Sequence, residues 1–302
     1  MESKLSKLTI KTYDNQLKLL LKKLNKEEDY LITNLDEVIK FIQKNYDNLG
    51  SQITVISSIL YSINNNQNIN DENKTLLKNN YKQIIAYNQN LINEKNKLNE
   101  KNEKESDNWM NWDEILELFK IQYNKYKKLI ENPKKMDIDL FYKIQNIIIL
   151  SLYIYEEPRR SEYIDVKYKN YDIKKDNFFD VKKKIIVLNN YKTSKTKNDF
   201  IIDLSKNKTL YNILINFIKL KEINLFNSDY LFISNIDTKL DESQLAKRLN
   251  SVFDKKISTS MIRKIYLSHM YGDTLQNLKN LKNTTINMGN SINTVLTNYL
   301  KN

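Results

Sequence analysis

The sequence predicts a two-domain protein that is mainly α-helical and carries a small β-hairpin in its C-terminal half. Three observations predict this fold class. Apolar residues recur at helical spacing through most of the chain. Residues 93–107 are almost entirely Asn, Lys and Glu, which favours a boundary between two domains. Two β-rich runs, residues 184–188 and 200–204, interrupt the helical pattern in the second half.

The N-terminal part, residues 1–100, is expected to be a small helical domain. Thr9 is a candidate N-cap for the first helix. The apolar stripe of that helix consists of Ile10, Tyr13, Leu17, Leu20, Leu21 and Leu24. Further helices are expected over residues 36–46, from Ser51 to about residue 63, and over residues 71–101. The polar stretch that follows reads either as a solvated helix end or as a flexible segment, and we place the linker at residues 101–108.

The C-terminal part, residues 109–302, opens with Trp109 and Trp112, which we expect to anchor its core. Pro158 is expected to end the strongly apolar helix before it. The two β-rich runs flank a polar segment and predict a hairpin with lysines at its tip. A short strand is expected over residues 230–233. The expected helices cover residues 115–129, 138–155, 210–221, 244–253, 260–271, 275–284 and 291–300.

Composition excludes several classes of site. The chain has no cysteine and a single histidine, His269, which excludes disulfides, thiolate metal sites and multi-histidine metal sites. We therefore expect no metal and no cofactor. No apolar run approaches the ~20 residues of a membrane span, and no secretory signal opens the chain. These features predict an intracellular, non-secreted protein that does not enter a membrane.

The net charge is +12 and the isoelectric point is about 9.3, which favours polyanionic partners and nucleic acid above all. Heavy use of Asn, Lys, Ile and Tyr is also what A/T-rich coding DNA produces, so part of the lysine content has a compositional explanation. Against this background the four arginines, Arg159, Arg160, Arg248 and Arg263, are informative. Only the planar guanidinium grips two phosphate oxygens at once, which lysine does not reproduce.

Three roles are needed to cleave a phosphodiester without a metal. A side chain such as tyrosine must attack the phosphorus. Two arginines can stabilise the extra charge on the non-bridging oxygens. A positioned acid such as lysine must give a proton to the departing oxygen. The sequence offers candidates in one order, namely Arg159 with Glu162, then Lys192, then Arg263, and then Tyr299.

This order resembles the catalytic domain of the tyrosine recombinases, the phage-integrase superfamily. Arg159 and Glu162 resemble the family's Arg-x-x-Glu box, with the two residues expected near one helix face. The resemblance implies that Arg159 contacts the phosphate and that Glu162 supports the active site. The alternative is a surface ion pair between them. Arg160 is the neighbouring candidate, but only Arg159 keeps the three-residue spacing to the acid.

The hairpin lysine and the second arginine follow. Lys192-Thr193 resembles the Lys-Thr of the family's β-hairpin, which implies that Lys192 is the general acid, with Lys195 and Lys197 as competing lysines. Ser260-Met261-Ile262-Arg263 resembles the family's His-x-x-Arg box, with serine in place of histidine. The Ser260 hydroxyl can still hydrogen-bond a phosphate oxygen, but it does not shuttle a proton as imidazole does.

The end of the chain supplies the nucleophile. Gly289-Asn290 stands nine residues before Tyr299, where the family often has Gly-His. Asn290 would then donate a hydrogen bond to the phosphate, and Tyr299 would be the attacking residue. Tyr266 and Tyr271 have the wrong spacing. His269 lies off the motif and reads as a packed or surface histidine.

The N-terminal part agrees with this resemblance, because Thr9-x-x-x-Tyr13 opens its first helix as in the family's core-binding domain. The resemblance implies a site-specific DNA recombinase or integrase that clamps double-stranded DNA and acts as a homotetramer on two duplexes. It implies a 3′-phosphotyrosyl intermediate and no need for ATP or metal. The proline-arginine-arginine run and the composition are most similar to integrases of viruses and mobile elements, whose location is wherever the target DNA lies. The alternatives are a type IB topoisomerase-like enzyme that relaxes DNA, and a catalytically inactive DNA-binding protein.

Overall fold

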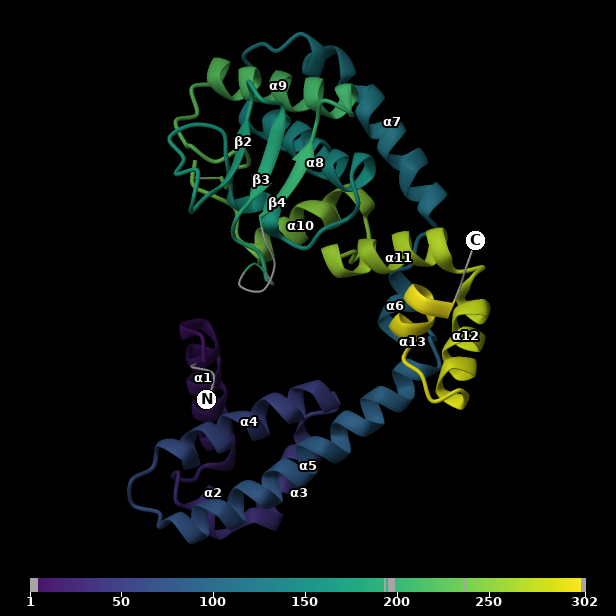
Figure 1. Ribbon diagram of the computed structural model, residues 1–302. Coiled ribbons are helices and arrows are strands. Elements are labelled where there is room, and N and C mark those ends of the chain that lie inside the picture. The colour runs from purple at the N-terminus through teal and green to yellow at the C-terminus, as the bar shows by residue number, and fades with distance from the viewer. Residues whose placement is uncertain (1–4, 193, 195–198, 236, 300–302) are drawn as a thin grey trace. The chain divides into compact units, whose positions relative to one another are not determined.

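The computed structural model describes residues 5–192, 194, 199–235 and 237–299, and of Leu8, Asn298 and Tyr299 it describes the backbone alone. The chain divides into two compact units, Met1–Lys101 and Asn102–Asn302, which are described separately below (Figure 1). Both units are mainly helical, and the small sheet belongs to the second. This is the predicted fold class.

The first unit is a bundle of helices. They are α1 (Lys7–Leu24), α2 (Tyr30–Thr33), α3 (Leu35–Asn45), α4 (Leu49–Asn65) and α5 (Asp71–Lys97). Helix α4 packs against α1 and α5, and Leu20 and Ile59 are fully buried between them. The buried Tyr81 of α5 donates its hydroxyl to the carbonyl of Leu31 at 2.8 Å, which ties α2 to the bundle.

Two helix starts differ from the sequence expectation. Helix α1 is capped by Ser6 rather than Thr9, because the Ser6 hydroxyl accepts the backbone N–H of Thr9 at 3.1 Å. Helix α4 begins at Leu49, ahead of Ser51, because the side chain of Asn48 accepts from the backbone N–H groups of Gly50 and Ser51. In both cases a polar side chain that lies earlier in the sequence than the expected residue caps the helix.

The segment expected as a linker, residues 101–108, contains a helix. Helix α5 ends at Lys97, and α6 (Glu103–Asn108) follows with a capping box between Asn102 and Glu105. Glu105 also pairs with Lys264, so α6 is fastened to the second unit.

The second unit is built around α8 (Ile138–Tyr155), against which α7 (Trp112–Glu131), α9 (Lys208–Ile223) and α10 (Glu242–Phe253) pack. By length and apolar composition α8 is a candidate membrane span within the described chain, yet 56% of it is buried inside the protein, as expected of a core helix. Trp112 is buried and meets Tyr266 edge-on at 5.1 Å, as the expected core anchor.

The remaining helices of this unit are α11 (Thr259–Tyr271) and α12 (Leu275–Asn287). The single terminal helix expected over residues 291–300 is instead the short α13 (Ile292–Thr294) followed by a π-helical turn, Val295–Tyr299. Ser291 caps α13 through the backbone N–H of Thr294.

A four-stranded sheet completes the second unit, in the order β1 (Val166–Lys167), β2 (Asn177–Asp180), β3 (Ile185–Leu188) and β4 (Phe200–Asp203). Strands β3 and β4 form the predicted antiparallel hairpin, with Leu188 opposite Phe200. Strands β1 and β2 were not predicted. The strand expected over residues 230–233 is reduced to isolated bridges, Lys167 to Tyr230 and Ile233 to Lys239.

Candidate functional site

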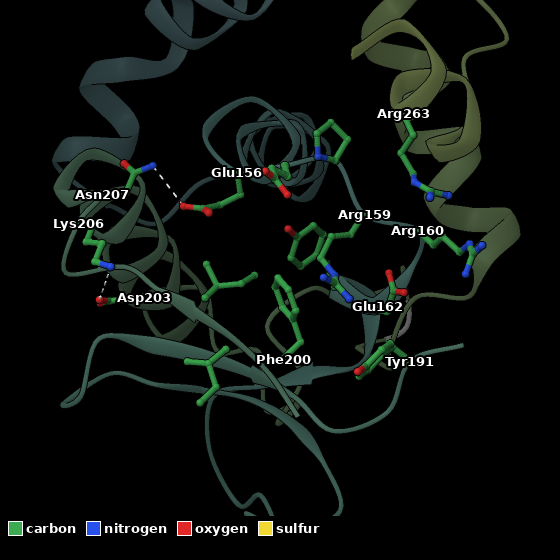
Figure 2. Close-up of a pocket in the computed structure, with 15 residues that line it drawn as sticks. Glu156, Arg159, Arg160, Glu162, Tyr191, Phe200, Asp203, Lys206, Asn207 and Arg263 are labelled. Carbon is green, nitrogen blue, oxygen red and sulfur yellow. Dashed lines mark hydrogen bonds and ion pairs between the residues drawn. The ribbon is translucent and has the colours of Figure 1, made fainter. Parts of the chain in front are cut away.

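A cavity of about 750 Å³ lies where the end of α8, strand β4 with the start of α9, and helix α11 meet (Figure 2). It holds three of the four arginines that the sequence singled out, namely Arg159, Arg160 and Arg263. Its lining residues are Glu156, Glu157, Pro158, Arg159, Arg160, Glu162, Tyr163, Tyr191, Phe200, Ile201, Ile202, Asp203, Lys206, Asn207 and Arg263.

Arg159 lies in the irregular stretch between α8 and the 3₁₀ turn Glu162–Asp165. The expected placement of Arg159 and Glu162 on one helix face is therefore wrong. Helix α8 ends at Tyr155, and the residue before a proline is disfavoured in the helical region, so the chain leaves the helix ahead of Pro158. This exit turns Arg159 toward the cavity.

Two aromatic rings hold the guanidinium of Arg159. Its Cζ lies 3.9 Å from the ring centre of Phe200 and 5.5 Å from that of Tyr191. A guanidinium over an aromatic face is attracted by the ring quadrupole. Phe200 begins β4 and Tyr191 lies in the segment after β3, so the β3–β4 hairpin supplies both rings that hold the guanidinium.

Arg159 and Glu162 do not form the ion pair that was the alternative reading. Glu162 is only 8% exposed, and no contact within ion-pair distance joins it to an arginine among the described residues. Nε of Arg159 and Oε2 of Glu162 are both buried without a hydrogen-bond partner. Unpaired buried polar groups are costly, which makes this end of the cavity receptive to a polar ligand or to water.

Arg263 reaches the same cavity from α11 (Figure 2). Ile262 and Ile265, on either side of it in the sequence, are buried and orient the helix. Arg160 also lines the cavity. Three guanidiniums from two distant parts of the chain thus share one cavity, and none of them has a carboxylate within ion-pair distance among the residues that the structure describes.

Two acidic groups of the cavity, Glu156 and Asp203, lie away from the arginines and have partners (Figure 2). Asp203 pairs with Lys206 at 3.8 Å, and Oε1 of Glu156 accepts a hydrogen bond from Asn207 at 3.4 Å. Burial raises the pKa of Glu156, and the nearby Glu157 and Asp203 act in the same direction while the Asn207 hydrogen bond opposes them. The cavity is therefore polarised, with an anion-seeking end at the arginines.

The other predicted residues lie outside the cavity lining. Lys192 is exposed and follows Tyr191, which does line it. Ser260 is exposed on the first turn of α11. Asn290 is occupied locally, with its side chain donating to the carbonyl of Met288 at 3.3 Å and its backbone N–H to Thr285 at 2.9 Å.

The remaining predicted residues are Lys195 and Tyr299. Lys195 lies outside the described residues. For Tyr299 only the backbone is described, in the π-helical turn that follows α13. The cavity therefore unites Arg159, Glu162 and Arg263.

Sequence reasoning missed the aromatic partners of Arg159 and the role of Asn207. Asn207 caps α9 by accepting from Leu210 at 3.1 Å and donates to the carbonyl of Tyr155 at 3.1 Å, so it joins the end of α8 to the start of α9. The signal for it was an asparagine just before a helical stripe. In a chain with 20 tyrosines and 10 phenylalanines, nothing marked out Tyr191 and Phe200.

Within the described part of the chain, no group of three or more His, Asp or Glu side chains could hold a metal ion. The cavity can bind an anion through its guanidinium groups. Lysine amines and the hydroxyls of serine and tyrosine lie on neighbouring segments.

Comparison with known proteins gave one structural likeness. No protein-family model matches the chain, and no curated protein matches it. A solved structure described as the crystal structure of XerA recombinase is 16% identical, and the match covers 86% of this chain and 76% of that one with a TM-score of 0.35.

Proposed function

We propose that the chain is a tyrosine recombinase, an enzyme that cleaves and rejoins DNA strands through a covalent tyrosine link. One observation carries the proposal: Arg159 and Arg263, far apart in the sequence, line one cavity without a carboxylate partner among the described residues. Two such forks suit the two non-bridging oxygens of a single phosphate. The net charge of +12 supports DNA as the source of that phosphate.

The proposed step is a displacement at phosphorus. The hydroxyl oxygen of Tyr299 attacks the scissile phosphate and gives its proton to solvent water, and a bond forms between that oxygen and phosphorus. The bond between phosphorus and the 5′-oxygen breaks as Lys192 gives its proton to that oxygen. The products are a 3′-phosphotyrosyl link and a free 5′-hydroxyl. Attack by that hydroxyl, or by one from a second duplex, reverses the step and restores the phosphodiester.

The charge that develops in this step is matched to the arginines. Arg159 and Arg263 would stabilise the five-coordinate phosphorus through charge-assisted hydrogen bonds. Ser260 and Asn290 would add neutral hydrogen bonds once DNA is bound, and Glu162 would hold the arginine segment in place. Because the link conserves the energy of the phosphodiester, the step consumes no ATP, and the proposal includes neither metal nor cofactor.

The partners follow from the same reaction. Exchange between two duplexes needs four strand cleavages, so we propose a homotetramer on two double-stranded DNA molecules. We also propose a viral or mobile-element origin and an intracellular location that follows the target DNA. The proline-arginine-arginine run, Pro158 to Arg160, and the lysine-rich composition support this.

The test is covalent trapping on a library of duplexes that carry a randomised site and a nick in one strand. Cleavage beside the nick releases a short fragment that diffuses away, so the protein stays linked to the DNA. Wild-type protein is expected to give an adduct that survives denaturation, and Tyr299→Phe none. Sequencing the trapped DNA identifies the preferred site.

Other outcomes assign other functions. An adduct with both proteins contradicts Tyr299 as the nucleophile. DNA binding without any adduct favours the catalytically inactive DNA-binding protein. Trapping that is accompanied by supercoil relaxation of plasmid DNA, with no strand exchange between two duplexes, favours the type IB topoisomerase-like enzyme.

A further inference from the structure

Asn177, the first residue of β2, is buried and has its side-chain hydrogen bonds committed to two segments of the candidate site. It is 1% exposed. Its Nδ2 donates to the carbonyl of Glu162 at 3.3 Å and to that of Asn190 at 2.9 Å. Its Oδ1 accepts the backbone N–H of Asn190 at 2.7 Å. An amide has two donor hydrogens and one acceptor oxygen, so both of its donors are used.

The two segments that Asn177 joins both carry residues of the proposed active site. Glu162 closes the arginine box that begins at Arg159. Asn190 directly precedes Tyr191, whose ring faces the Arg159 guanidinium. Lys192 is the next residue after Tyr191. One side chain therefore ties the segment of the phosphate-binding arginine to the segment of the hairpin lysine.

The backbone ladder does not make this connection. The pairing of β2 with β3 runs from Asp180 opposite Ile185 to Phe178 opposite Val187, and goes no further. Past that point side chains join the β2 segment to the chain that follows β3. Besides Asn177, the amide of Asn189 donates to the carbonyls of Asp176 and Ile173 at 2.7 and 3.0 Å. The Asn177 side chain accepts from the backbone N–H of Asn190 and donates to its C=O. These two hydrogen bonds replace a backbone pair that the β2–β3 ladder does not form there.

We propose that Asn177 is a positioning residue for the proton donor. It fixes the start of the lysine-bearing loop after β3 against the arginine segment, so that Lys192 meets the departing 5′-oxygen while Arg159 holds the phosphate. This inference rests on the proposed function. It concerns the leaving group specifically, and that separates it from a general contribution of Asn177 to folding.

The experiment compares two leaving groups on the site recovered by covalent trapping. One nicked duplex carries the natural 5′-oxygen at the scissile phosphate, and the other carries sulfur in its place. A thiolate leaves without a proton, so the sulfur duplex does not need the proton donor. In Asn177→Asp the two donated hydrogen bonds are lost and a carboxylate faces two carbonyls, while the shape of the side chain is kept.

The expected result is a selective loss. Since a positioned acid contributes about 10²–10⁴-fold, we expect Asn177→Asp to slow adduct formation at least ~10-fold on the oxygen duplex and less than ~3-fold on the sulfur duplex. Equal slowing on both duplexes, or no slowing on the oxygen duplex, overturns the inference. Wild-type protein without an adduct on either duplex overturns the proposed function instead.

Two further variants complete the design. Asn224 is a matched control, because its amide also joins two segments, accepting from Met136 at 3.0 Å and donating to Leu220 at 2.8 Å, and it is not among the cavity residues. Asn224→Asp is expected to lower the melting temperature and leave the ratio of the two rates unchanged. If Asn177→Asp does not fold, Asn189→Ala weakens the same attachment of the loop after β3 at a partly exposed position and is expected to show a smaller loss of the same kind. An unchanged ratio in that variant overturns the inference.

Discussion

Aromatic rings cover the face of the Arg159 guanidinium, while its edge is not paired with a carboxylate among the described residues. Phe200 and Tyr191 take the face, at 3.9 and 5.5 Å from Cζ. The edge, where the N–H groups point, has no carboxylate within ion-pair distance among the described residues. This arrangement is suited to a ligand with two oxygens in one plane, because stacking fixes the plane of the fork without using its donors.

Phe200→Leu tests that role of the ring. Because the cation–π contact contributes about 0.5–2 kcal/mol, we expect adduct formation to slow by roughly 2- to 30-fold. Phe200 is 40% exposed, so the melting temperature should change little. Rates from the trapping assay and a thermal melt provide the measurement. Tyr87→Leu, at an exposed aromatic position of the first unit, is the control, and equal slowing in both variants contradicts the stacking role.

At this scale the sequence was informative where a residue type was rare. Arginine is scarce in a chain rich in lysine, and that scarcity correctly marked three residues of the cavity, Arg159, Arg160 and Arg263. Asn177 carries no such signal, because asparagine is abundant and its importance arises only from the point at which the β2–β3 ladder ends. The relation of Arg159 to Glu162 was also wrongly assigned to a helix, since spacing alone does not distinguish a helix from the turn that follows Pro158.

At the scale of elements, α9 carries a lysine inside the protein. Lys221 is completely buried, donates to the carbonyl of Ser228 at 3.1 Å and to that of Tyr230, and lies 4.6 Å from the ring centre of Tyr168. Burial lowers the pKa of Lys221 to about 7, although the nearby Asp237 opposes the shift. The contacts hold the segment that forms the bridge between Tyr230 and Lys167.

Lys221 gives the second unit a pH-dependent stability. Above pH 7 the folded side chain is neutral, while the unfolded one stays protonated up to its ordinary pKa of 10.5. Folding then releases a proton, so the free energy of unfolding should rise with pH from about 7 to 9, by at most about 1.4 kcal/mol per pH unit. In Lys221→Met this rise should disappear.

Urea unfolding followed by tryptophan fluorescence measures this free energy. Both tryptophans, Trp109 and Trp112, belong to the second unit, so the signal reports on that unit alone. A wild-type curve that is flat between pH 7 and 9, or a variant with the same slope as wild type, contradicts the assignment.

Elements were predictable where several signals agreed. Helix α8 has the bounds that the sequence predicted, because Asp137 caps it, its interior is continuously apolar and Pro158 follows it. Strand β1 has two residues and β2 has four, too few for an alternating pattern to be recognised, and what makes them strands is their pairing with each other and with β3. The expected strand at residues 230–233 failed for the converse reason, since only one bridge forms at each end.

At the scale of the whole molecule, charge is the dominant feature. A net charge of +12 on 302 residues, spread mainly over lysines, favours a binding surface that follows a phosphate backbone. The sequence could predict this partner class but not the meeting of Arg159 and Arg263, which depends on how α8, the sheet and α11 pack together.

The affinity for duplex DNA should therefore depend steeply on salt. If about six to ten phosphates are contacted, the association constant should fall by roughly 10³–10⁵ between 50 and 200 mM monovalent salt. Fluorescence anisotropy with a labelled duplex of the trapped sequence provides the measurement. An affinity that is nearly independent of salt contradicts a binding surface built on lysines.

The central claim is that Arg159 and Arg263 act on one phosphate, and a double-mutant cycle on the rate of adduct formation tests it most directly. Since lysine keeps the charge but not the fork, Arg159→Lys and Arg263→Lys should each slow the reaction by about 10²–10³-fold. Groups that act as a unit are not additive, so the double variant should lose clearly less than the product of the two single losses. Losses that multiply independently, or an Arg263→Lys variant as fast as wild type, would contradict the account.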